Sequence, residues 1–294
     1  MKKAAPIFVF LAGILWGTMG IFVRQYNAQG MDSMEIVAVR AVVTAILMGS
    51  FMLIYNPKLL RIRWKDIWCF LGTGLLSILF FNFCYFKAIS MTSMSVAAVL
   101  LYTAPAIVMV LSRILFQEKL TGVKIGALIA TFIGCVFVTG MVGSDECLSI
   151  QGILVGLGAG LGYALYSIFS RYALERGYHS FTISFYTFLI AAIGVLPFVK
   201  LPVMVQVCFD NWYMVGFTIV FGLVSTVLPY ILYTIGLEKV ENGKASIIAS
   251  IEPVVATILG ILVFHEALKF HVILGICLVL GAIIVCNLWK KGIE

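Results

Sequence analysis

Charged residues are scarce in this sequence. Asp, Glu, Lys and Arg make up only 11% of its 294 residues, whereas they are about 25% of an ordinary soluble domain. Hydrophobic residues reach 62%, against about 45–50% in such domains. The net charge of +7 is scattered among short loops, which does not favour nucleic-acid binding. The composition excludes a soluble fold and indicates an all-α integral membrane protein.

Motifs of common enzyme and nucleotide-binding classes are also missing. His265 and Glu266 resemble the start of a zinc-binding HExxH motif, but Lys269 stands where the second histidine is required. We find no nucleophile elbow, P-loop or Rossmann fingerprint, and no ring of charges typical of a channel. We therefore predict no catalytic residues, metal site or cofactor, with an intramembrane enzyme kept as an alternative.

The seven cysteines form no CxxC pair. Five lie in apolar runs and are expected to be small core residues: Cys69, Cys84, Cys135, Cys277 and Cys286. Cys147 and Cys208 fall in predicted loops, so a disulfide between them is left open.

Long apolar runs dominate what remains. A spanning helix needs about 20 mainly apolar residues, and the charged and turn-rich points divide the chain into ten such segments. The predicted spans are 5–23, 33–55, 66–86, 95–116, 122–142, 151–172, 180–199, 211–236, 243–264 and 270–289. Glycines at helical spacing, such as Gly13, Gly17 and Gly20, indicate that some of these helices pack closely.

The basic residues predict how the spans are oriented. With ten spans and a cytoplasmic N-terminus, the outer face carries only four of the 20 Lys and Arg residues: Arg24, Lys87, Lys200 and Lys269. All others except Arg40, which lies inside a span, fall on the cytoplasmic face. This positive-inside bias predicts that both termini are cytoplasmic.

The two halves of the chain resemble each other. The segment TAPAIVMVLSRILFQEKL (103–120) aligns without a gap on IEPVVATILGILVFHEAL (251–268), matching Pro105 to Pro253 and Glu118 to Glu266. Upstream, GIFVRQYNAQG (20–30) aligns on SIFSRYALERG (167–177) at nearly the same offset. The chain therefore divides into two repeats, 1–143 and 150–294, of five helices each.

Because each repeat has an odd number of helices, the two repeats are inverted relative to one another in the membrane. Inverted repeats are typical of secondary transporters, in which the substrate site lies near the bilayer midplane at the repeat interface. A duplicated bundle that is only structural is the alternative, which we weigh as weaker because inverted symmetry supplies two mirror-related gates.

Several of these features resemble one known family. The ILWG of residues 14–17, Arg40 in the second span, the EP of residues 252–253 and the two P–E spacings are similar to the EamA family of the drug/metabolite transporter superfamily. The resemblance covers essentially the whole chain. The first repeat departs from the second in having Ala104 where Glu252 stands.

The resemblance implies a ten-helix bundle around a cavity lined by the first, third, fourth, sixth, eighth and ninth helices. It also implies a transporter of the inner (plasma) membrane that exports amino acids or similar small amphipathic metabolites. The expected partners are a small-molecule substrate and membrane lipid, without nucleic acid, and the expected state is a monomer or weak dimer. A flippase for a lipid-linked precursor is the alternative, since small relatives in the superfamily imply it.

Glu252 and the paired prolines are the sharpest candidates for function. A charged residue at a helix centre costs about 2.5–3.5 kcal/mol on insertion scales, so Glu252 should face a cavity, exchange a proton or pair with a substrate ammonium group. Its alternative role is a structural hydrogen bond. Pro105 and Pro253 each remove an amide donor and bend the helix, which predicts hinges, with static kinks as the alternative.

Polar and aromatic side chains inside the cavity-lining spans complete the candidate site. With Glu252, the predicted substrate-binding residues are Trp16, Asn82, Tyr102, Tyr163, Tyr166, Tyr230 and Tyr233. Their polar tips need partners when buried, so a cavity that they line suits a zwitterion with an apolar side chain, although simple packing is an alternative for each. For Arg40 we expect a structural ion pair or snorkelling to the interface.

Overall fold

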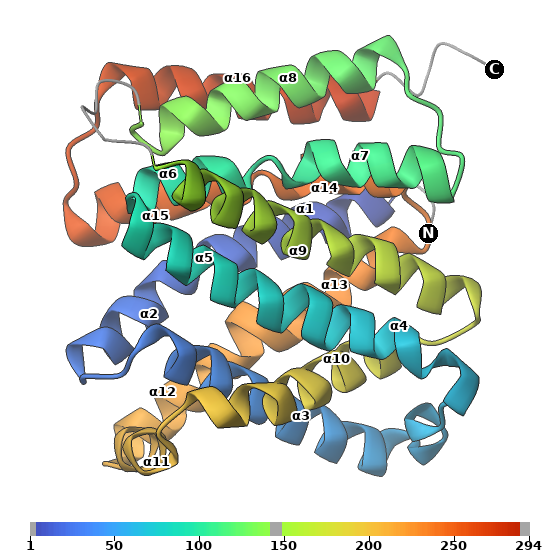
Figure 1. Ribbon diagram of the computed structural model, residues 1–294, viewed down its shortest axis with the longest axis vertical. Helices are drawn as coiled ribbons and strands as arrows, with labels where there is room; N and C mark the ends of the chain where they lie inside the picture. The colour runs from blue at the N-terminus through green and yellow to red at the C-terminus, as the bar shows by residue number, and fades with distance from the viewer. Residues whose placement is uncertain (1–3, 142–148, 289–294) are drawn as a thin grey trace.

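The computed structural model describes residues 4–141 and 149–288, and within these ranges all regular structure is helical (Figure 1). Nine segments of the described chain are long and apolar enough to span a membrane, and Gly122–Val138 is a shorter apolar helix. These ten segments correspond to the ten predicted spans. The largest differences occur where the first and third spans extend to Ala28 and Met91. The prediction of an all-α membrane protein built from two repeats is confirmed.

Several spans are interrupted, so the helices outnumber them. The first half contains α1 (Ala5–Gly17), α2 (Met19–Ala28), α3 (Ser33–Tyr55), η1 (Pro57–Leu60), η2 (Trp64–Asp66), α4 (Ile67–Leu71), η3 (Gly72–Leu79), α5 (Phe80–Met91), α6 (Met94–Leu101), α7 (Ala104–Leu115) and α8 (Gly122–Val138). The second half contains α9 (Ile150–Glu175), α10 (Ser180–Val195), η4 (Leu196–Phe198), α11 (Leu201–Cys208), α12 (Trp212–Gly222), η5 (Leu223–Val227), α13 (Leu228–Leu237), α14 (Asn242–Ala249), α15 (Glu252–Phe264) and α16 (Phe270–Leu288).

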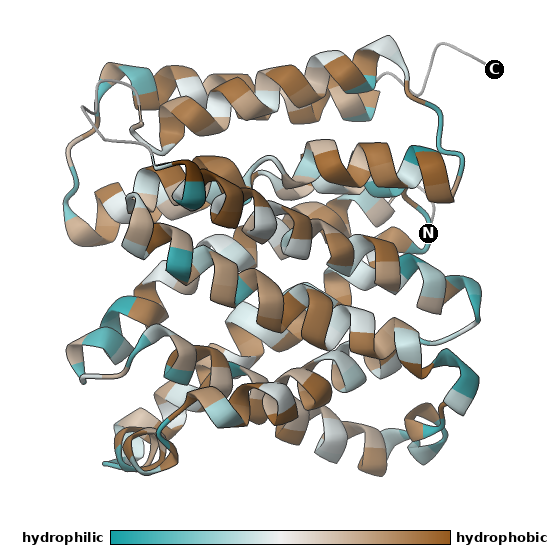
Figure 2. Ribbon diagram, in the orientation of Figure 1, coloured by the Kyte–Doolittle hydropathy of each residue, from teal (hydrophilic) through white to brown (hydrophobic). Residues whose placement is uncertain are grey.

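The two halves interlock rather than forming separate bundles. Helix α1 packs along α13, and the equivalent helix of the second half, α9, packs along α5. Helices α8 and α16, the last spans of each half, form a pair at one edge of the molecule (Figure 1). Figure 2 shows apolar residues along the helices and hydrophilic residues gathered at their ends. That distribution matches a bundle whose outer surface faces lipid.

The third and eighth spans contain π-helical stretches at equivalent places. They are η3 (Gly72–Leu79) and η5 (Leu223–Val227), and within them Ser77 matches Ser225 at the repeat offset. Pro229 follows η5 in the first turn of α13. Such π segments often occur at functional sites.

The fourth and ninth spans are broken into half-helices. Helix α6 ends at Leu101 and α7 begins at Ala104, while α14 ends at Ala249 and α15 begins at Glu252. Pro105 and Pro253 lie in the first turn of the second half-helix, where a missing amide proton costs no helical hydrogen bond. The expectation that each proline bends a continuous helix is therefore wrong, because the break precedes the proline. Their role as hinges stays a prediction.

Close backbone packing surrounds both breaks in the same way. A Cβ atom added at Gly13 of α1 would lie 2.9 Å from the carbonyl oxygen of Ala249. The equivalent residue in α9, Gly160, would meet the carbonyl oxygen of Leu100 at 2.9 Å. Gly20, by contrast, has no atom within 4 Å of such a Cβ. Each repeat thus presses a glycine of its first span against the broken helix of the other repeat.

We expect Gly13→Val to destabilise the fold by about 1–3 kcal/mol, because the new side chain overpacks the contact with α14. Gly20→Val is the matched control, since that position is open, and it should leave stability nearly unchanged. Thermal unfolding of the two purified variants measures the difference. Equal unfolding midpoints for the two variants would contradict the packing that we describe.

Of the two cysteines in the disulfide that the sequence leaves open, the structure describes Cys208. Cys208 lies at the end of α11, a short helix outside the spans, with 7% of its surface exposed. Burial raises the pKa of its thiol, so little reactive thiolate forms at neutral pH. Its proposed partner, Cys147, lies outside the described residues.

Candidate functional site

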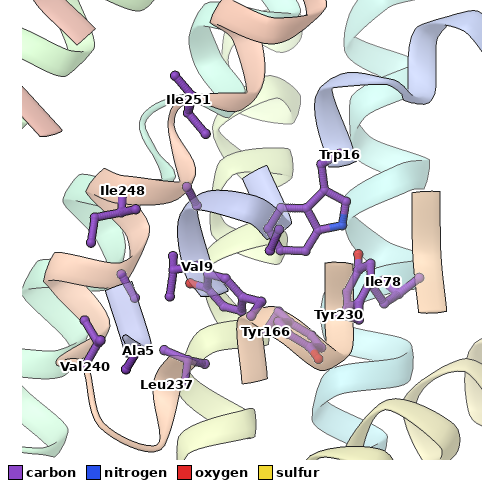
Figure 3. Packing of buried hydrophobic residues seen from close by; sticks show 14 of the residues in the cluster. Ala5, Val9, Trp16, Ile78, Tyr166, Tyr230, Leu237, Val240, Ile248 and Ile251 are labelled. Atoms are coloured by element: carbon purple, nitrogen blue, oxygen red, sulfur yellow. The ribbon is translucent and has the colours of Figure 1, made fainter. Parts of the chain in front are cut away.

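Aromatic rings from three helices meet at the centre of the bundle (Figure 3). The indole of Trp16 in α1 lies 5.1 Å from the ring of Tyr230 and 5.2 Å from that of Tyr233, both in α13. Tyr166 of α9 contacts Tyr230 at 4.9 Å between ring centres. Because α1 belongs to the first repeat and the tyrosines to the second, this cluster forms part of the repeat interface.

A small cavity lies within the cluster. Its volume is about 20 Å³, and it is lined by Trp16, Ser77, Ile78, Phe81, Tyr163, Tyr166, Ser167, Tyr230 and Tyr233. A cavity needs about 10–15 Å³ to hold one water molecule. The cavity therefore has space for about one water molecule and none for a metabolite.

Glu252 lies beside this cavity rather than in a continuous helix. The Tyr163 hydroxyl donates a hydrogen bond of 2.9 Å to its carboxylate. Glu252 is also the first residue of α15, where the helix dipole stabilises negative charge. Gly17 of α1 lies so close that an added Cβ would be 2.8 Å from the Glu252 carbonyl oxygen. The helix break, the carboxylate and α1 therefore meet at one place.

Buried N–H donors near the cavity lack acceptors. Arg40 in α3 is 2% exposed, and its Nη1 contacts the sulfur of Met19 at 3.2 Å. Within the described chain, its Nε and Nη2 atoms and Nε1 of Trp16 have no hydrogen-bond partner. The Arg40 charge lies within electrostatic range of the Tyr230 hydroxyl and the Glu252 carboxylate. Unpaired buried donors are costly, so each such group requires an explanation.

The structural role expected for Arg40 is not observed. Glu35 forms a capping box with Asp32 at the start of α3, with reciprocal hydrogen bonds of 2.9 Å, and does not pair with Arg40. The guanidinium is buried, so it does not snorkel to the interface either. The prediction of a structural pair or snorkelling is wrong because the only acidic group on the same stretch of helix is used by the cap.

The sequence-predicted residues are only partly brought together. Trp16, Tyr163, Tyr166, Tyr230 and Tyr233 line the cavity, and Tyr163 connects it to Glu252. The remaining two, Tyr102 and Asn82, do not line it. Tyr102 packs against the surrounding core, and the Asn82 amide donates to the Ile78 carbonyl of its own span at 2.7 Å.

Sequence reasoning missed four residues that line the cavity. They are Ser77, Ile78, Phe81 and Ser167. The Ser167 hydroxyl is 2.7 Å from the Tyr233 hydroxyl, and Ser77 lies in the π-helical η3. The repeat alignment offers a signal for both serines, because Ser77 matches Ser225 and Ser167 begins the segment that aligns on residues 20–30.

The end of the bundle that we expect to face the cytoplasm is closed by contacts between the repeats. The Glu118 carboxylate accepts hydrogen bonds from the backbone N–H groups of Asn242 at 2.7 Å and Gly243 at 3.2 Å. Within the second repeat, Arg171 donates to the Asn242 side chain at 3.0 Å, and Lys124 pairs with Glu241 across the repeats. Asn242 is fully buried, so this network excludes water from the start of α14.

The opposite end is held by a more exposed contact. Arg24 and Glu266, the repeat equivalents of Arg171 and Glu118, form an ion pair of 2.5 Å with side chains 55% and 48% exposed. The Arg24 guanidinium also lies 3.8 Å from the centre of the Phe264 ring. Equivalent residues therefore close the two ends of the bundle differently.

Comparison with known proteins decides the family. The model of the EamA-like transporter family matches residues 3–140 and 150–288, once in each repeat. The chain belongs to the EamA-like transporter family. As an EamA protein with multiple apolar helices, it is a multi-pass membrane transporter.

Two relatives are similar to this EamA transporter over nearly their whole length. It is 25% identical to the uncharacterized transporter YxxF of Bacillus subtilis (strain 168), covering 99% of this chain and 92% of that protein. It is 28% identical to an uncharacterized transporter of Archaeoglobus fulgidus, covering 96% and 95%. A solved crystal structure has the same fold, with a TM-score of 0.80, 17% identity and 99% coverage of both chains.

Proposed function

We propose that this EamA transporter is a secondary active transporter of the inner (plasma) membrane that exports amino acids or similar small amphipathic metabolites by alternating access, with both termini in the cytoplasm. The observation that carries the proposal is the pairing of a partly buried carboxylate with unpartnered buried donors beside a central cavity. These groups lie where the two repeats meet, the expected position of a transporter's substrate site.

The chemistry of these groups matches a zwitterion. The free N–H groups of Arg40 and Trp16 require acceptors, which a substrate carboxylate supplies, since guanidinium groups bind carboxylates through paired hydrogen bonds. Glu252 offers the opposite charge for an ammonium group. The rings of Trp16 and Tyr230 provide an apolar wall for a side chain. The carboxylate of a zwitterion would therefore pair with Arg40, and its ammonium group would pair with Glu252.

The small cavity volume supports alternating access. With space for about one water molecule, the site admits an amino acid only if the surrounding helices separate. The half-helices of the fourth and ninth spans and the π segments of the third and eighth are repeat-related places for such movement.

Uptake into proteoliposomes tests the proposal. Purified protein is reconstituted with a panel of labelled amino acids and the corresponding amines that lack the carboxylate, with and without a pH gradient, beside protein-free liposomes. We expect transport of some amino acids and poor transport of their amines. No uptake of any candidate would overturn the proposal, and translocation of labelled lipid instead would favour the flippase.

Arg40→Gln should remove the preference for the carboxylate. A hydrogen bond to a charged group contributes about 1.5–3 kcal/mol, so uptake of the amino acid should fall about 10- to 150-fold, while uptake of the amine should not fall. Met19→Leu is the control, because it removes the sulfur contact but keeps the guanidinium. An Arg40→Gln variant that elutes as a folded protein and still prefers the amino acid would exclude Arg40 as the carboxylate anchor.

A further inference from the structure

A basic pocket lies far from the central cavity, at the end of the bundle expected to face the cytoplasm. Its volume is about 290 Å³. It is lined by residues 58–63 of the connection between α3 and α4 in the first repeat, by residues 176–179 of the connection between α9 and α10 in the second, and by Thr182 in the first turn of α10. A phosphate group is small enough to enter a pocket of this size. The proposed transport mechanism uses none of these residues.

Positive charge in the pocket exceeds negative charge. Four basic side chains line it: Lys58, Arg61, Arg63 and Arg176. Asp66 neutralises part of this charge, through contacts of 2.7 Å to Arg63 and 3.2 Å to Arg176. Within the described residues, Lys58 and Arg61 form no ion pair. Two cations are therefore free for a ligand.

The walls of the pocket are fixed by hydrogen bonds that join the α3–α4 connection to the α9–α10 connection and to α10. The hydroxyl of Thr182 donates to the carbonyl oxygen of Leu59 at 2.7 Å, and that of Tyr186 donates to Leu60 at 2.6 Å. The Tyr178 hydroxyl accepts from the Arg63 amide at 3.0 Å and donates to Asp66 at 2.8 Å. The pocket is thus built from ordered backbone, so a ligand would not have to organise the connections.

The surroundings of the pocket are those of a membrane interface. Trp64, 85% exposed, and Trp68, 39% exposed, lie at the start of the third span, and tryptophans are enriched at headgroup level. The Arg176 guanidinium lies 4.9 Å from the centre of the Trp68 ring. Basic residues next to a span attract anionic lipid headgroups.

The orientation of the protein does not by itself require this pocket. A positive-inside bias needs basic residues in the loops but not their convergence in one hollow. The equivalent connection of the second repeat, residues 199–211, has Lys200 as its one Lys or Arg. The basic pocket is therefore a feature of one repeat connection and not a product of the inverted symmetry.

We propose that this pocket binds a phosphate group, carried by the headgroup of an anionic phospholipid or by a free phosphate anion. Lys58 and Arg61 supply the charges that bind the phosphate oxygens, while the contacts of Asp66 with Arg63 and Arg176 hold the pocket in shape. A bound lipid headgroup would contact both the α3–α4 connection of one repeat and the α9–α10 connection of the other.

The test uses the full-length protein purified in detergent and titrated with short-chain lipid. Dioctanoyl phosphatidylglycerol should raise the thermal unfolding midpoint, whereas dioctanoyl phosphatidylcholine should not. In Lys58→Gln/Arg61→Gln, half-maximal stabilisation should need about 30-fold more phosphatidylglycerol, since each basic residue contributes about fivefold at a membrane surface. Lys119→Gln/Lys239→Gln, which removes two exposed charges at the same end, should behave like the wild type.

A second arm distinguishes the two sources of phosphate. Sodium phosphate is compared with sodium chloride at equal ionic strength. If phosphate stabilises the wild type and the lipid does not, with the same dependence on Lys58 and Arg61, the site takes a free phosphate anion. Equal responses of both double variants to either ligand, or no stabilisation of the wild type by either, would overturn the proposal.

Discussion

Replacing Glu252 with glutamine is expected to lower transport of an amino acid about 10- to 150-fold, the effect of losing one hydrogen bond between charged groups. Glutamine keeps an oxygen that accepts from the Tyr163 hydroxyl, so the local contact survives while the negative charge is lost. The defect should therefore appear in substrate affinity or turnover rather than in folding. Uptake into proteoliposomes across a range of substrate concentrations measures it.

Two further variants distinguish the effect of the Glu252 charge from the effect of the orientation of its carboxylate. Tyr163→Phe keeps the charge but removes the hydroxyl that orients the carboxylate, so its defect should be smaller than that of Glu252→Gln. Glu175→Gln is the matched control, because it makes the same change at an exposed residue of α9. Normal transport by Glu252→Gln with an unchanged pH dependence would contradict a functional role for this carboxylate.

Much of the fold could be predicted because the membrane restricts it strongly. In lipid every backbone polar group must be satisfied within the segment, so long apolar runs are helices, and the spans 33–55 and 180–199 were located to within about a residue. The breaks were harder to predict. Neither break contains glycine or proline, since residues 101–104 are LYTA and residues 249–252 are ASIE. Only the prolines that follow, with Glu252 in the ninth span, indicated that these spans are not uniform.

The candidate site was less predictable than the fold. Repeat matching and span position pointed to Trp16 and Tyr163, which do line the cavity. They could not give the side-chain direction of Asn82, which bonds its own helix. Nor could they show that Glu35 is used in a cap and leaves Arg40 unpaired. Both outcomes depend on competition between local and long-range partners, which spacing alone does not determine.

The largest conformational effect is expected at the partly buried hydrogen-bond network of Glu118. Its carboxylate accepts from two backbone amides at the start of α14, and charged hydrogen bonds contribute about 1.5–3 kcal/mol each. Glu118→Ala should therefore destabilise the closed state of this end by about 3 kcal/mol or more. That change moves a two-state equilibrium by more than about 100-fold.

Labelling of a single cysteine measures this opening. Ser246→Cys, placed at a position 6% exposed in α14, is introduced into protein whose native cysteines are replaced, and its reaction rate with a membrane-impermeant maleimide is followed. Glu118→Ala should raise that rate strongly. Glu266→Ala is the repeat-matched control, since it breaks an exposed ion pair of about 0–1 kcal/mol. The repeat places a glutamate at each end, but Glu118 accepts from the backbone at the start of α14 whereas Glu266 pairs with the exposed side chain of Arg24. If both variants change labelling equally, the Glu118 network therefore does not hold this end closed.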